Sequence, residues 1–129
     1  MDKEKHYKLK FKKILATNQL VSGDNVFDWT VEQLQHNGIN VDSYMTGVEY
    51  EVINSNIDDE IKFQLVDSLD VLIHEFADIA AINGVHLFEQ YLSYLPQGTK
   101  LRVIYKKTGI SDCCLKVNLI RHIETKAAE

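Results

Sequence analysis

The residues most suited to chemistry lie in the segment DSLDVLIHEFADIA, residues 67–80. It contains the letters HEFAD, which differ at one position from the H-E-x-x-H pattern of zinc proteases. In that pattern two histidines one helical turn apart bind zinc, and the glutamate activates a water molecule. Asp78 stands here in place of the second histidine. A carboxylate can replace a histidine, so a metal site stays the weaker alternative, and we expect no metal, no cofactor and no catalytic residue.

The same segment carries a polar stripe. Asp67, Asp70, His74 and Asp78 recur at intervals of three and four residues, which places side chains on one face of an α-helix. The opposite face would hold the apolar residues Ile61, Leu65, Leu69, Leu72, Ile73, Phe76 and Ile79. The spacing therefore predicts an amphipathic helix from about residue 58 to residue 82, with the polar stripe in solvent.

The rest of the chain divides into strand and helix patterns. Alternation of apolar and polar residues predicts strands at residues 6–13, 47–53, 100–106 and 114–120. Residues 22–38 contain Asp24 as a helix cap, have Asp28 and Glu32 early in the segment, and end at Asn37-Gly38, which together are typical of a helix. Residues 85–95 predict a second, short helix that ends before Pro96.

This order of elements, β-α-β-α-α-β-β, predicts the fold class. The last two strands read as an antiparallel hairpin, with Cys113 facing the core. We expect an α+β fold, a two-layer sandwich with a mainly antiparallel sheet and helices packed on one face. A length of 129 residues is that of a single domain, residues 1–129.

Charge is unevenly distributed along the chain. Residues 1–13 hold six lysines against two acids, and residues 100–129 hold seven Lys or Arg against three acids, so each end carries a net charge of +4. Residues 14–99 hold fourteen acids against Lys62, a net charge of -13. Such segregation creates a field that attracts partners of opposite charge. An overall charge of -5 disfavours nucleic acid as a partner.

Location follows from two further observations. No run of about 18 apolar residues is present, so we expect no contact with a membrane. The two cysteines are neighbours, Cys113 and Cys114, which disfavours a shared metal or an ordinary disulfide. We therefore expect a cytoplasmic protein.

These observations favour a non-enzymatic protein-binding module with an acidic recognition face. The specific expectation is an inhibitor, immunity protein or antitoxin that occludes a basic, nuclease-like partner. The expected partner-binding residues are Asp59, Glu60, Asp67, Asp70, His74 and Asp78, with Glu49 and Glu51 as a second set. The alternatives are a small enzyme or ligand-binding domain with a pocket between helices and sheet, and an accessory protein that forms oligomers.

Overall fold

The computed structural model describes residues 4–11 and 20–126, which form ten β-strands and no helix. The predicted α+β fold, with helices packed on one face of a sheet, is therefore wrong. Because the described residues contain no helix, they contain no pocket between helices and a sheet. Within the described residues there is no helix long and apolar enough to cross a membrane.

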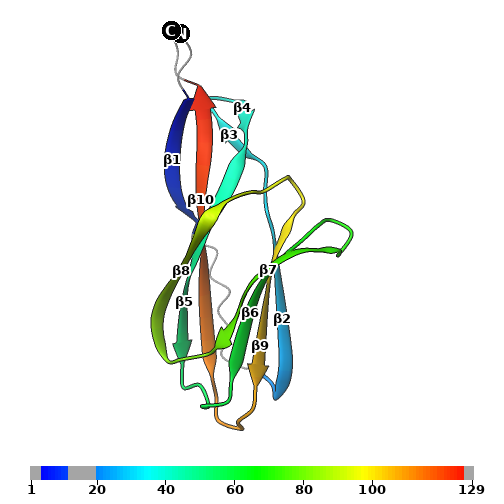
Figure 1. The fold of residues 1–129 in the computed structure, drawn as a ribbon, viewed down its shortest axis with the longest axis vertical. Coiled ribbons are helices and arrows are strands. Elements are labelled where there is room, and N and C mark those ends of the chain that lie inside the picture. The colour runs from blue at the N-terminus through cyan, green and yellow to red at the C-terminus, as the bar shows by residue number, and fades with distance from the viewer. Residues whose placement is uncertain (1–3, 12–19, 127–129) are drawn as a thin grey trace.

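Eight of the strands form two four-stranded sheets that face each other (Figure 1). The first sheet contains, in spatial order, β1 (Glu4–Phe11), β10 (Cys114–Lys126), β5 (Ser43–Ile53) and β8 (Gly84–Tyr94). The second contains β2 (Gly23–Thr30), β9 (Lys100–Lys107), β6 (Glu60–Val66) and β7 (Leu72–Ala80). A ribbon of β3 (Leu34–His36) and β4 (Ile39–Val41) lies between β2 and β5 in the chain. All pairings are antiparallel, and this strand order is that of a jelly roll.

The core lies between the two sheets. Alternate residues of β5, β6, β9 and β10 point inward and are almost completely buried, among them Val48, Phe63, Val103 and Leu115. The predicted strands at 47–53, 100–106 and 114–120 are confirmed, because period-two alternation marks a strand with one buried face. The predicted strand at 6–13 corresponds to β1, whose side chains lie outside the described ones.

The helix predicted at residues 22–38 is wrong, because an Asn-Gly dipeptide can form the turn of a β-hairpin as well as end a helix. Asn37 has a φ of 52° and Gly38 a φ of 76°, so both lie in the left-handed region. Two such residues form the tight turn of a β-hairpin, here the one joining β3 to β4. The dipeptide that can end a helix instead reverses a strand.

The helix predicted at residues 58–82 is wrong for a different reason. In β7 the register against β6 shifts twice, so that Ile73 and Phe76 are each an extra residue without a partner in the ladder. These bulges break the period of two and bring apolar residues to helix-like spacing. The expected burial of Leu69, Leu72 and Ile73 is also wrong, because they are 81%, 52% and 54% exposed.

The two remaining predictions for the C-terminal half are also corrected. Residues 85–95 belong mainly to β8 and are not a helix. The strands β9 and β10 do not form a hairpin but lie in opposite sheets. Cys113 does face the core as predicted, with its Sγ 3.2 Å from the Tyr105 hydroxyl oxygen.

Candidate interaction surfaces

The incomplete zinc pattern does not gather its side chains in one place. His74 pairs with Leu65, which points into the core. Asp78 pairs with Lys62, which lies between two core-facing residues of β6 and so points away from the core. His74 and Asp78 therefore project from opposite faces of the second sheet. Among the described residues, no group of three or more His, Cys, Asp or Glu side chains could hold a metal ion.

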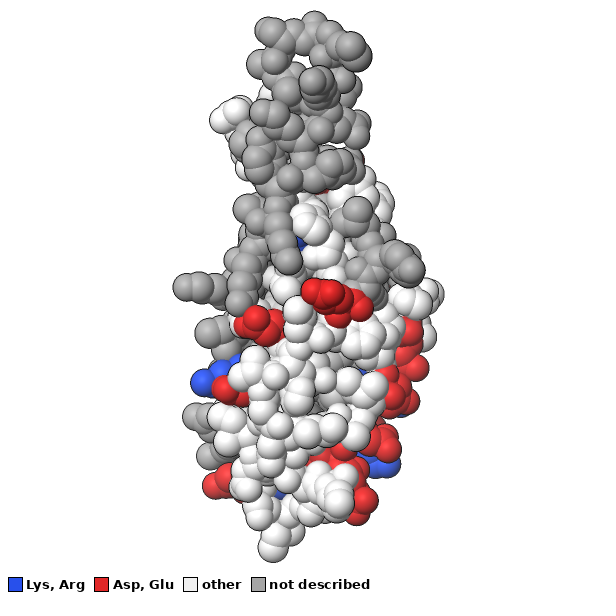
Figure 2. Space-filling view, turned by 60° about the vertical axis from the view of Figure 1, so that its left-hand side comes forward, with Lys and Arg blue, Asp and Glu red and all other residues white. Residues whose placement is uncertain are grey.

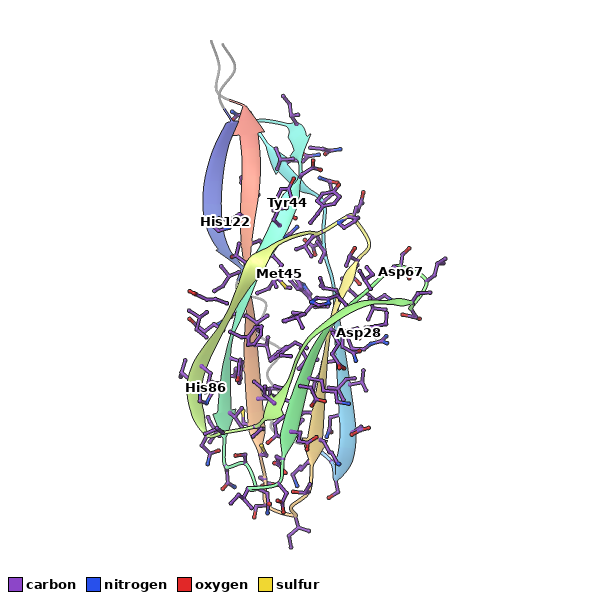
Figure 3. All side chains as sticks on the ribbon, viewed as in Figure 1. Asp28, Tyr44, Met45, Asp67, His86 and His122 are labelled. Carbon is purple, nitrogen blue, oxygen red and sulfur yellow. The ribbon has the colours of Figure 1, made fainter. Side chains whose placement is uncertain are left out.

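Asp67 organises the turn that joins β6 to β7. Its carboxylate Oδ1 accepts hydrogen bonds from the backbone N–H groups of Leu69 (2.8 Å) and Val71 (2.9 Å). Its own N–H donates to the Val71 carbonyl at 2.9 Å. Asp side chains commonly fix turns in this way, by bonding to backbone groups two or more residues ahead. The turn projects from the sandwich, with Asp67 near its base (Figure 3).

Asp70 ties this turn to β9. It has a φ of 64°, a left-handed conformation that Asp tolerates better than most residues. Its Oδ1 lies 2.7 Å from Lys100 Nζ and 3.4 Å from an Arg102 guanidinium nitrogen. The hydrogen bond from Lys100, with its charge, lowers the pKa of Asp70. Arg102 also makes two hydrogen bonds to Asp28, which lower the pKa of that carboxyl.

The fixed turn presents aliphatic side chains to solvent. Leu69 is 81% exposed, Val71 58%, Leu72 52% and Ile73 54%. We call residues 67–73 the β6–β7 hairpin tip. The sequence pattern does not reveal this surface, because its spacing places the same aliphatic residues on the buried face of a predicted helix. The signal available was the Asp67–Asp70 turn pattern, which ends the strand and places Leu69 within the turn.

Asp59 is buried and accepts hydrogen bonds that hold neighbouring segments together. Its residue is 1% exposed, and its carboxylate accepts hydrogen bonds from the Tyr105 hydroxyl (2.6 Å), the Thr108 N–H and hydroxyl (2.8 Å each) and the Asn56 N–H (3.1 Å). Burial is the largest single influence on the Asp59 pKa and would raise it. The hydrogen bonds together outweigh burial, so the pKa lies below its ordinary value. Burial, followed by the bond to Asp59, raises the pKa of Tyr105.

Three of the predicted partner-binding residues line one hollow. Asp59, Glu60 and Asp78 border a cavity of about 540 Å³ beside the β5–β6 loop. Glu60 and Asp78 are exposed, and Asp78 Oδ2 lies 3.9 Å from Lys62 Nζ. Of this set, Glu60 and Asp78 present carboxylates that a partner could reach.

The other predicted residues lie elsewhere. Glu49 and Glu51 are in β5 of the first sheet, with Asn118 Nδ2 3.3 Å from Glu49 and Lys116 Nζ 3.6 Å from Glu51. His74 is exposed on β7, with its ring stacked on Phe76 at a centroid distance of 6.3 Å. Asp67 and Asp70 belong to the hairpin tip. The structure therefore distributes the predicted residues over both sheets and a turn.

Charge is unevenly distributed among the strands. Residues 43–99, which contain β5 to β8, hold ten acids against Lys62. Residues 100–107 of β9 hold four cationic residues, and β9 lies between β2 and β6. The half of the sandwich that contains β5 to β8 therefore holds more acidic than basic residues. Figure 2 shows one face on which more acidic than basic side chains are visible around a broad uncharged area.

Comparison with known proteins yields no family. No family model matches the chain, and no curated protein sequence matches it. Among solved structures, a chain from "Structure of infectious bursal disease virus Gx strain" aligns with 12% sequence identity and a TM-score of 0.44. The alignment covers 94% of this chain and 32% of that chain, so this chain spans about a third of the length of the viral protein.

Proposed function

We propose that this chain is a non-enzymatic protein-binding module that anchors its partner through the β6–β7 hairpin tip. The observation that carries the proposal is the exposure of Leu69, Val71, Leu72 and Ile73 on a turn fixed by Asp67 and Asp70. Clustered aliphatic side chains in water are costly to keep, and where they persist they commonly mark interaction sites.

The rigidity of the turn supports a binding role. A partner that closes on the hairpin tip need not order it first, because the Asp67 carboxylate and the Asp70–Lys100 ion pair already do so. Preorganisation of this kind lowers the entropic cost of association. The bulges at Ile73 and Phe76 interrupt the free edge of β7, which disfavours simple strand addition. We therefore propose recognition through side chains, with the aliphatic groups entering an apolar pocket.

The partner we propose is a basic protein. The exposed acids among residues 43–99, such as Glu60 and Asp78, would accelerate its approach, and the aliphatic anchors would then slow its dissociation. The specific form of this proposal is an inhibitor or antitoxin that occludes a nuclease-like cleft, where cationic groups otherwise hold phosphate. We place it in the reducing cytoplasm, because its two cysteines, Cys113 and Cys114, are sequence neighbours, which disfavours an ordinary disulfide between them.

Photo-crosslinking tests the proposal. Benzoylphenylalanine placed at position 69, in the cell that makes the protein, should trap a discrete partner whose sequence is basic. The matched control carries the same group at position 39, because Ile39 is an equally aliphatic residue, 69% exposed, in the β3–β4 ribbon. Equal trapping from both positions, or an acidic protein trapped from position 69, would contradict the proposal.

A further inference from the structure

Two isoleucines are exposed at the end of the sandwich opposite the hairpin tip. Ile57 in the β5–β6 loop is 92% exposed, and Ile110 in the β9–β10 loop is 97% exposed. These loops lie together at the lower end of the molecule in Figure 1. The seven residues of β6 separate this loop end from the hairpin tip, a distance of roughly 20 Å. The loop end is therefore a surface separate from the hairpin tip.

Hydrogen bonds between the loops hold the isoleucines in place. The Thr108 N–H and hydroxyl in one loop donate to Asp59 at the end of the other, at 2.8 Å each. Asn54 Nδ2 donates to the Asp112 carbonyl at 2.6 Å. Gly109 lies so near Asn56 that a Cβ added to it would meet that side chain at 3.2 Å. The two highly exposed isoleucines therefore lie on loops that are joined to each other by hydrogen bonds.

The surroundings of Ile57 are acidic. Ile57 borders the cavity of about 540 Å³, together with the exposed side chains of Asp58, Glu60 and Asp78 and the single cation Lys106. Lys62, near Asp78, offsets part of this charge. Ile110 borders a second cavity of about 360 Å³, which is lined mainly by amide and hydroxyl side chains and also by Lys107 and the buried Asp59. The loop end therefore combines two exposed aliphatic side chains with a cavity beside Ile57 that suits a cationic group and a cavity beside Ile110 that suits hydrogen-bonding groups.

We propose that the loop end is a second protein-contact surface, which takes a basic segment of a partner between Ile57 and Ile110. Aliphatic side chains of that segment contact the two isoleucines, and a lysine or arginine enters the hollow bordered by Asp58, Glu60 and Asp78. Charge selects this occupant. The carboxylates repel an anionic membrane, and they repel the same acidic surface of a second copy. The chain then has two contact surfaces at opposite ends of β6 and β7.

The test is an NMR titration of the ¹⁵N-labelled chain with a short capped peptide of alternating leucine and lysine. The control peptide replaces lysine by glutamate. The lysine peptide should shift the amides of residues 57–60 and 108–111, and added salt should weaken the effect. Ile57→Ser with Ile110→Ser should weaken binding by roughly tenfold or more, since two buried aliphatic contacts are lost. Ile39→Ser should leave binding unchanged.

Three results would overturn the proposal: equal shifts with both peptides, shifts scattered over the whole chain, or unaltered binding by the Ile57→Ser, Ile110→Ser variant. Loop-end shifts that grow with protein concentration alone would assign the surface to a second copy instead. Leu69→Ser with Leu72→Ser should not alter this titration, so failure at the loop end and failure at the hairpin tip are distinguishable.

Discussion

Replacement of Asp59 is the strongest test of the loop architecture. Asp59→Ala removes the acceptor of four hydrogen bonds, and one of its donors, the Tyr105 hydroxyl, is buried. A buried polar group left without a partner costs about 1–3 kcal/mol, and a hydrogen bond to a charged group contributes about 1.5–3 kcal/mol. Thr108 and Asn56 are exposed and can turn to water. We therefore expect Asp59→Ala to lower the free energy of unfolding by about 3–4 kcal/mol.

The pH dependence gives this prediction a second, independent readout. Folding holds the Asp59 pKa below its ordinary value, so the ionised carboxylate stabilises the fold at neutral pH. That contribution is fully present above the unfolded pKa of about 3.9 and is lost as the pH falls through the lower folded pKa. The stability difference between wild type and Asp59→Asn should therefore shrink from about pH 5 to pH 2.

Urea unfolding followed by fluorescence of Trp29, the single tryptophan and a buried residue, measures both quantities. Asp58→Asn is the matched control, because its exposed side chain should change stability by less than about 0.5 kcal/mol. A loss below about 1 kcal/mol for Asp59→Ala would refute the reasoning, because it would mean that Tyr105 finds another partner at little cost. A wild-type advantage over Asp59→Asn that is unchanged in acid would refute the assigned pKa direction.

Three further predictions concern the fold and the hairpin tip. Leu69→Ala should change the free energy of unfolding by less than about 0.5 kcal/mol, whereas Phe63→Ala should cost about 3–5 kcal/mol; equal losses in urea melts would restore the helical interpretation. Gly47→Ala should cost about 1–3 kcal/mol in thermal melts, because its Cβ would lie 2.6 Å from a β8 carbonyl oxygen, and an unchanged melting temperature would be the contrary result. Asp67→Ala should speed hydrogen exchange of the Leu69 and Val71 amides, whose hydrogen bonds the Asp67 carboxylate accepts. Asp67→Asn keeps an acceptor oxygen and should restore the protection of these amides. Identical exchange in both variants would deny Asp67 this role.

The sequence predicts the strands whose pattern is undisturbed and misses those whose pattern is broken. Regular alternation in 100–106 and 114–120 identifies β9 and β10, because each buries every second residue. Alternation cannot say that these strands lie in opposite sheets, since that is a property of the jelly-roll connections. The bulges at Ile73 and Phe76 change the period of β7 to one that resembles a helix.

The candidate surfaces were predictable only in part. The segregation of charge along the chain carries over to space only in part: β5 to β8 lie on one side of the sandwich, but Asp24 and Asp28 of the acidic segment lie on β2, beside the cationic β9. The roles of individual acids depended on contacts that spacing cannot supply. Asp59 meets Tyr105 from 46 residues away, and Asp70 meets Lys100 from 30 residues away. The exposed aliphatic residues were hidden by the helical interpretation itself.

The most direct test of the central claim is the affinity of the purified partner, identified by crosslinking, for three forms of the chain. Isothermal titration should show that Leu69→Ser with Leu72→Ser weakens binding by roughly thirtyfold or more, as expected when anchor side chains worth about 2 kcal/mol are removed. Ile39→Ser should bind like the wild type. Affinities within a factor of about two for all three forms, with unfolding free energies unchanged, would contradict a binding module anchored by the β6–β7 hairpin tip.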